Sequence, residues 1–172
     1  LLAEGFEEIE ALTVVDILRR GGVGVDTVSI GATREVIGTH QVTVVADEIF
    51  EKEAVEKADG IILPGGMPGA ANLAADERVI LALQHAFGQG KLTAAICAAP
   101  MVLGKSGILQ GKQATCYPGF EPKLTGAIPR DQIVVKDGMI ITSRGPATAM
   151  AFAFALLETL AGEETARQVK EG

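Results

Sequence analysis

The chain is poor in the residue types that mark several classes of protein. It has two cysteines, two histidines, one tyrosine and no tryptophan among its 172 residues. Two cysteines far apart in the sequence do not support a disulfide framework, so a reducing compartment such as the cytoplasm is the simpler expectation. His40 and His85 have no ligand-type neighbours at useful spacing. The sequence therefore predicts no metal site.

The chain also has no basic stripe and no long apolar run. Its net charge is −7, and acidic residues gather at 4–10, 47–56 and 163–171, which argues against nucleic-acid binding. No stretch of about 18 apolar residues occurs, so we expect no membrane span. The first residues lack a signal-peptide pattern. They are typical of a strand whose start is missing, and we expect a single domain over 1–172.

Apolar residues make up 48% of the chain, and short strand patterns alternate with helical ones. This alternation predicts an α/β protein with a mostly parallel sheet and helices on both faces. In such sheets, sites form at the carboxyl ends of the strands. The helix 147–161 is so apolar that we expect it to be largely buried. The expected helices are 7–20, 76–88, 147–161 and 163–170, and the expected strands are 23–30, 35–37, 42–46, 59–63, 92–96, 133–135 and 139–142.

Cys97 directly follows the apolar strand 92–96. Ala95 and Ala99 stand two residues before and after it, as a nucleophile elbow requires, because the sharp strand-to-helix turn leaves no room for bulk there. Pro100 suits the first turn of a helix, and a helix N-terminus would favour the thiolate of Cys97. An ordinary core cysteine is an equally good interpretation of this residue by itself.

A second strand end, after Leu63, leads into a loop rich in glycine and proline. The N–H groups of Gly66 and Ala98 could form an oxyanion hole beside Cys97, because glycine lets the backbone approach a ligand closely. The alternative is an ordinary Gly-Pro turn. The loop lacks the lysine and the spacing of a phosphate loop, so nucleotide binding has little support.

The acidic residues at the start of the first helix include two candidates for a buried carboxyl. Glu10 shares a helical stripe with Val14, and so does Glu7. A carboxylate on an apolar stripe is costly unless it is partnered or protonated. The helical periodicity does not choose between Glu7 and Glu10.

Four segments, 4–10, 63–66, 94–100 and 142–146, resemble in order and spacing the ThiJ/PfpI superfamily, most closely the branch of the parkinsonism-associated protein deglycase and its bacterial relatives. The resemblance covers nearly the whole chain. It implies a flavodoxin-like three-layer sandwich with a nucleophile elbow at Cys97, commonly as a homodimer. It assigns the conserved acid of the family to Glu10, which is thought to be protonated, to hydrogen-bond the thiolate and so to depress the pKa of the thiol.

The chain departs from parts of that superfamily. Ala98 stands where the protease branch has histidine, and no histidine follows His85, so no Cys-His dyad is visible. Tyr117 stands where many close relatives have histidine, and His40 falls where their pocket has arginine. These changes bear on the choice of substrate and on the rate. The pocket implied by the resemblance consists of Gly65, Met67, Tyr117, His40, Arg19 and Pro146.

The resemblance implies a glyoxalase or deglycase that needs no cofactor. Cys97 would attack a 2-oxoaldehyde such as methylglyoxal, Glu10 would move a proton between the two carbons, and lactate would result. The partner would be a small reactive aldehyde or a glycated protein. A redox-sensing stress protein or chaperone with an oxidisable Cys97 is the alternative. A cysteine peptidase has less support, because the dyad histidine is missing.

Overall fold

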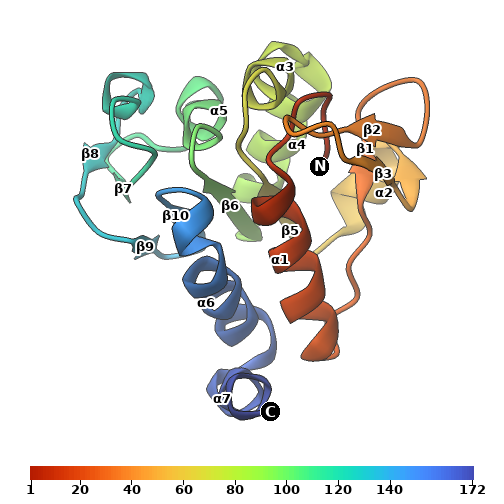
Figure 1. The fold of residues 1–172 in the computed structure, drawn as a ribbon. Helices are drawn as coiled ribbons and strands as arrows, with labels where there is room; N and C mark the ends of the chain where they lie inside the picture. The colour runs from red at the N-terminus through yellow and green to blue at the C-terminus, as the bar shows by residue number, and fades with distance from the viewer.

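The computed structural model describes residues 1–172, folded as a central sheet between two layers of helices (Figure 1). The helices are α1 (Glu8–Arg20), α2 (Lys52–Lys57), α3 (Gly69–Ala75), α4 (Glu77–Gly88), α5 (Pro100–Lys105), α6 (Ala149–Ala161) and α7 (Glu163–Glu171), with the 3-10 turns η1 (Glu121–Lys123) and η2 (Pro146–Thr148). The strands are β1 (Val28–Ser29), β2 (Glu35–Ile37), β3 (Thr43–Val45), β4 (Glu48–Ile49), β5 (Gly60–Leu63), β6 (Leu92–Ile96), β7 (Gln113–Ala114), β8 (Ile128–Pro129), β9 (Val134–Asp137) and β10 (Ile140–Ser143).

The main sheet has the strand order β5-β6-β10-β9. Strands β5, β6 and β10 are parallel, and β9 runs antiparallel to β10. The pair β1 and β4 joins this sheet through the first residues of the chain, because Leu2 bridges to Ser29 and the Leu1 amino group donates to Ile62 O at 2.9 Å. The carboxyl ends of β5, β6 and β10 therefore lie at one edge, which is where the predicted site residues follow.

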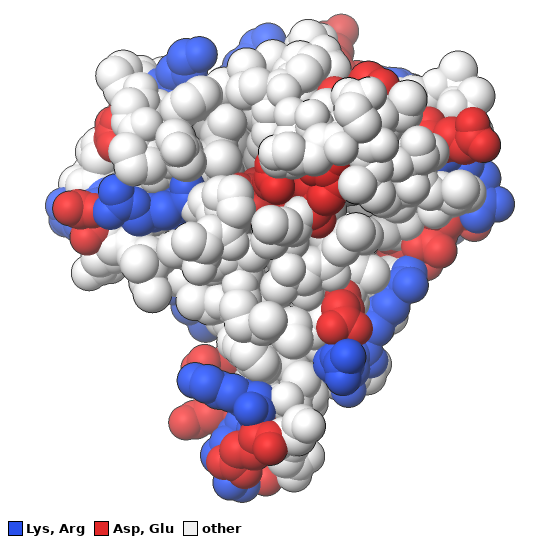
Figure 2. All heavy atoms as spheres, in the orientation of Figure 1, with Lys and Arg blue, Asp and Glu red and all other residues white.

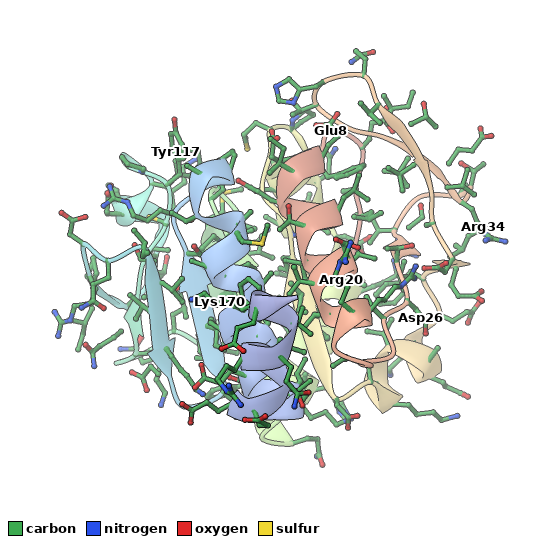
Figure 3. The ribbon with its side chains drawn as sticks, turned by 60° about the horizontal axis from the view of Figure 1, so that its bottom comes forward. Glu8, Arg20, Asp26, Arg34, Tyr117 and Lys170 are labelled. Atoms are coloured by element: carbon green, nitrogen blue, oxygen red, sulfur yellow. The ribbon has the colours of Figure 1, made fainter.

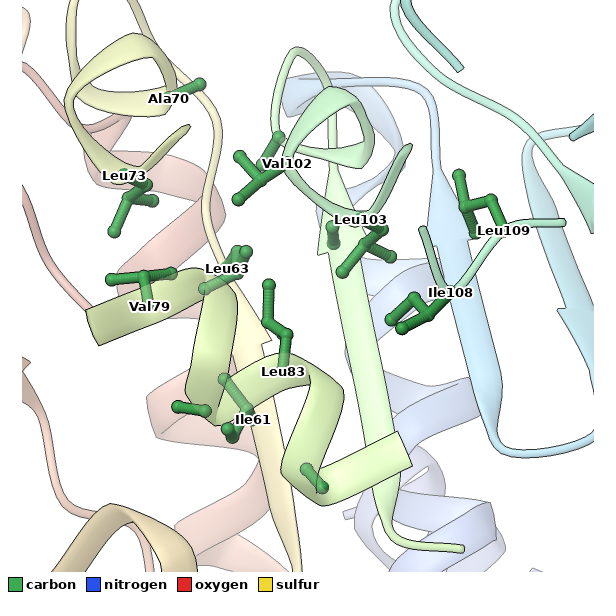
Figure 4. Packing of buried hydrophobic residues seen from close by; sticks show 14 of the residues in the cluster. Ile61, Leu63, Ala70, Leu73, Val79, Leu83, Val102, Leu103, Ile108 and Leu109 are labelled. Atoms are coloured by element: carbon green, nitrogen blue, oxygen red, sulfur yellow. The ribbon is translucent and has the colours of Figure 1, made fainter. Parts of the chain in front are cut away.

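Each face of the sheet buries one apolar cluster. Helices α1 and α6 cover one face, where Val14 and Leu18 of α1 pack with Phe152 and Leu156 of α6. Helices α3, α4 and α5 cover the other face, and their inward side chains fill the space against β5 (Figure 4). This is the three-layer α/β sandwich that we predicted.

The expectation that the helix 147–161 is largely buried is only partly right. Its first residues form the 3-10 turn η2, and the side chain of Met150 is 52% exposed. The fully buried residues of α6 lie on one stripe that faces the sheet and α1.

The differences from the predicted elements lie in short segments. The predicted strand 23–30 is reduced to β1, and the short helices α2 and α3 were not predicted. The hairpins β2–β3 and β9–β10 form as predicted. No helix of the protein has the length and apolar character needed to cross a bilayer.

Candidate active site

Cys97 adopts the backbone conformation of a nucleophile elbow. Its φ is 65°, a value that non-glycine residues seldom adopt. The backbone around it is fixed by neighbouring segments, because Cys97 N donates to Ser143 O at 3.0 Å and Tyr117 N donates to Cys97 O at 2.8 Å. Pro100 opens α5, as the sequence predicted. The turn therefore holds the Cys97 side chain at the carboxyl edge of the sheet, half-buried and not enclosed in the core.

The carboxyl group of Glu10 lies beside Cys97. Glu10 is 1% exposed, and its Oε2 accepts a hydrogen bond from Gly65 N at 2.8 Å. Its other oxygen, Oε1, is buried with no hydrogen-bond partner of good geometry, while the carboxyl and the thiol of Cys97 are close enough to interact. Glu10 is thus the residue, of the two left open by helical periodicity, whose carboxyl faces the cysteine.

Gly65 separates the two reactive side chains. A Cβ at this position would lie 2.6 Å from both Cys97 Cβ and Glu10 Oε2. The site therefore needs glycine at position 65 because only a residue without a side chain leaves room for the cysteine and the carboxyl together.

Two backbone amides lie close enough to the sulfur of Cys97 to lower the pKa of its thiol. They belong to Gly66, whose φ is 87°, and to Ala98, the first residue after the elbow. These are the two N–H groups that the sequence predicted would face the cysteine. The same donors could hold an oxyanion that forms on a carbon bonded to the sulfur.

Burial controls the charge of the pair. It raises the pKa of Glu10 to about 7, against a smaller opposite effect of the Gly65 N–H. Burial and the neighbouring Glu10 carboxylate raise the pKa of the Cys97 thiol to about 12, although the two amides act to lower it. This raised thiol pKa includes the effect of an ionised Glu10, whereas the depressed thiol pKa that the resemblance implies concerns a protonated Glu10 and stays a prediction. The two groups titrate as a coupled pair, in which Glu10 is the one that changes charge near neutral pH.

Several predicted pocket residues surround this centre. Tyr117 is 47% exposed, and its own backbone N donates to Cys97 O. Its ring would lie 3.1 Å from a Cβ on Gly145, next to Pro146. Met67 is 46% exposed, and its carbonyl accepts a hydrogen bond from Thr39 Oγ1. Tyr117 lies at the upper end of the molecule in Figure 3, the same end at which Glu8 of α1 is found.

Arg19 does not belong to the pocket, contrary to prediction. Its guanidinium donates to Val25 O at 2.7 Å and to Asp47 Oδ2 at 2.8 Å. It lies in the last turn of α1, nine residues beyond Glu10, which is about 14 Å along a helix. The resemblance supplied no motif around this position, and the structure places Arg19 at the other end of the helix.

His40 has partners that the sequence did not indicate. Its Nδ1 lies 2.9 Å from Glu8 Oε2 and 3.5 Å from Glu7 Oε2, and its backbone N donates to Glu8 Oε1 at 2.8 Å. The expectation that His40 lacks ligand-type neighbours is wrong, because the β2–β3 hairpin folds back over the start of α1. No local signal could have found this contact, since 32 residues separate His40 from Glu8.

The fold and the site together define the class of this protein. It is an α/β sandwich protein with a cysteine at a strand-to-helix elbow and a buried carboxyl beside that cysteine. The DJ-1/PfpI family profile matches residues 1–159, and the chain belongs to that family. Protein dj-1beta of Drosophila melanogaster is 39% identical over 100% of this chain and 93% of its own length. The Caenorhabditis elegans protein named glutathione-independent glyoxalase DJR-1.2 is 36% identical over 94% of this chain and 86% of its own length. A solved structure of oxidized Toxoplasma gondii DJ-1 has a TM-score of 0.92 and 38% identity, covering 99% of this chain and 93% of that one.

Proposed function

We propose that the protein is a cysteine-dependent glyoxalase or deglycase that acts on 2-oxoaldehydes, or on their protein adducts, without a cofactor. The observation that carries the proposal is the contact of Cys97 with both the Glu10 carboxyl and the Gly66 and Ala98 amides. A nucleophile, a proton acceptor and oxyanion donors then surround one point. The name of the Caenorhabditis elegans relative supports an aldehyde substrate.

The reaction follows from the charges of the pair. Glu10, with a pKa of about 7, accepts the thiol proton as the sulfur of Cys97 bonds to the aldehyde carbon of methylglyoxal. The resulting hemithioacetal alkoxide lies against the amides of Gly66 and Ala98 and is then protonated. Glu10 moves the proton from the former aldehyde carbon to the neighbouring carbon, and the hydroxyl proton passes to the oxygen of that neighbouring carbon, which gives a thioester of lactate. Water hydrolyses the thioester, releasing lactate and the free thiol, so no oxidant or reductant is consumed.

The test is lactate formation from methylglyoxal in the presence of a chelator and without glutathione. Wild type should form lactate, while Cys97→Ala and Glu10→Gln should each lose at least about 100-fold in kcat/KM. Cys116→Ala is the matched control, because Cys116 is the other cysteine and lies in the core with 3% exposure. No lactate above the level of Cys97→Ala would refute the proposal.

A second candidate function is redox sensing, for which the oxidized state named for the Toxoplasma gondii relative is the specific support. The amides that face Cys97 would equally accept the oxygens of a sulfinate. Mass spectrometry after mild peroxide treatment distinguishes the two functions. A sensor accumulates oxidised Cys97 without turnover, while the enzyme returns its thiol unmodified. A peptidase has less support, since no histidine contacts Cys97.

We further propose a homodimer in the cytoplasm. Ile9 and Leu12 on α1 are 55% and 40% exposed, and Met150 on the neighbouring helix α6 is 52% exposed, so these two helices present apolar side chains that a second copy could cover. Size-exclusion chromatography with light scattering should give twice the chain mass for wild type and the chain mass for Ile9→Arg. A monomeric wild type would contradict this proposal.

A reducing compartment keeps Cys97 as the thiol that the reaction needs.

A further inference from the structure

A histidine and two glutamates to which the proposed reaction assigns no chemical step meet at the start of α1. The ligand-type atoms of Glu7, Glu8 and His40 all lie within 4.8 Å of one another. Figure 3 shows Glu8 at the end of α1 beside the loop that joins β2 and β3. Figure 2 shows acidic atoms over this end of α1, surrounded by uncharged residues in that view.

The two carboxylates of this cluster are buried without enough positive charge. The side chains of Glu7 and Glu8 are only 9% and 10% exposed, and neither forms an ion pair with lysine or arginine. His40 can supply at most one positive charge to the two of them. Buried carboxylates are costly unless they are paired or coordinate a metal. One negative charge of this cluster therefore lacks a partner even when His40 is protonated.

Glu7 provides an independent observation. Its carboxylate accepts no hydrogen bond, and its Oε2 lies 3.5 Å from His40 Nδ1. A side chain buried to this extent normally has its oxygens satisfied. The Glu7 carboxylate instead points at the same ring nitrogen as Glu8, with its lone pairs available.

Glu8 and the hairpin loop are built for a fixed geometry. Glu8 Oε1 accepts the backbone N–H of His40 at 2.8 Å, and Gly38 packs so closely on the Glu8 carboxyl that a Cβ there would collide with it. This leaves Glu8 Oε2 facing the ring of His40 at 2.9 Å. The residue after the histidine, Gln41, has a φ of 66°, which fixes the turn that carries His40.

The two separations from His40 Nδ1 match those of ligands around one ion, and all three ligand-type atoms lie within 4.8 Å of one another. Bonds of about 2.0–2.2 Å place neighbouring ligand atoms about 2.9–3.5 Å apart in octahedral or tetrahedral coordination. The distances from His40 Nδ1 to the two carboxylate oxygens are 2.9 and 3.5 Å. We propose that Glu7, Glu8 and His40 bind one divalent transition-metal ion such as Zn²⁺, with water at the remaining positions. The ion neutralises both carboxylates and joins the β2–β3 hairpin to α1.

Zn²⁺ alone is the probe in the experiment that tests this site. The metal-free protein is titrated with ZnCl₂ by calorimetry, with His40→Asn, His85→Asn and Cys97→Ala as variants. The chain has only two histidines, so His85, exposed on α4, is the matched control for His40. His40 is itself 70% exposed, so its replacement should leave the fold intact, which circular dichroism checks.

Wild type, His85→Asn and Cys97→Ala should each bind one equivalent of Zn²⁺. His40→Asn should bind at least about tenfold more weakly, because even the outer partners of a metal site contribute that much. Co²⁺ bound to wild type should show no thiolate-to-metal charge-transfer band. The proposal is overturned by an absence of stoichiometric binding, by equal affinity of His40→Asn and wild type, or by loss of the ion in Cys97→Ala. The outcome is independent of the lactate assay, which contains a chelator.

Discussion

Gly65→Ala tests whether the active site depends on the space between its two side chains. The added Cβ would lie 2.6 Å from both Cys97 Cβ and Glu10 Oε2, and 2.9 Å from Ile96 O. Carbon atoms in van der Waals contact lie about 3.5 Å or more apart. The thiol and the carboxyl must therefore move away from the new Cβ by about 1 Å. A misplacement of that size lowers catalysis on the order of 100-fold. Overpacking of this kind also lowers the free energy of unfolding by about 1–3 kcal/mol. Each kcal/mol lost should lower the Tm by about 2–4 °C.

The assay compares kcat/KM for lactate formation and the Tm of Gly65→Ala with those of wild type. Gly88→Ala is the control, because a Cβ at this position in α4 would have no heavy atom within 4 Å. This control should keep full activity and gain about 0.4–1 kcal/mol from the less flexible unfolded chain. A Gly65→Ala variant with kcat/KM within threefold of wild type would refute the reasoning, since the collision would then relax without moving Cys97 or Glu10.

Three further predictions follow from the charges. Burial raises the pKa of Glu10 from its usual 4.5 to about 7. Protonated Glu10 therefore contributes about 3 kcal/mol to the free energy of unfolding, in full below about pH 4.5. This contribution is lost as the pH rises through 7. Urea unfolding should show this loss in wild type and not in Glu10→Gln, and parallel curves would contradict it. The kcat/KM of wild type should rise with pH through about 7, as the base form of Glu10 appears, and a pH-independent rate would exclude Glu10 as the base. In Glu10→Gln, the loss of the Glu10 charge should lower the pKa of the Cys97 thiol below about 12, as measured by thiolate absorbance. An unchanged thiol pKa would mean that burial alone raises it.

The elbow was predictable because its causes are local. A fully apolar strand, small residues on either side of Cys97 and Pro100 directly after them specify a sharp turn into a helix, and the structure has it. The sheet and its helices were predictable from the alternation of patterns. The choice of Glu10 over Glu7 was not, because both lie on one helical stripe, and only the family resemblance and the packing against Gly65 separate them.

The errors share one cause, which is that the sequence shows local effects and hides tertiary ones. The sequence shows a helix N-terminus that favours the thiolate of Cys97, but it hides the burial and the Glu10 carboxylate that raise the pKa of this thiol. His40 looked isolated until the hairpin placed it over Glu8. Arg19 was assigned to the pocket although the helix carries it toward Asp47 instead.

The hydrogen bonds that hold the elbow have a consequence for how the protein fails on heating. Cys97 N and Tyr117 N bond to segments at the carboxyl edge of the main sheet, and the strand before Cys97 is buried along its whole length. The amides at these two positions should exchange with solvent only when the whole sheet opens, so the elbow has no separate melting step. Inactivation and global unfolding should then share one midpoint. A core substitution far from the site that raises this midpoint should extend the working range of the cysteine by the same number of degrees.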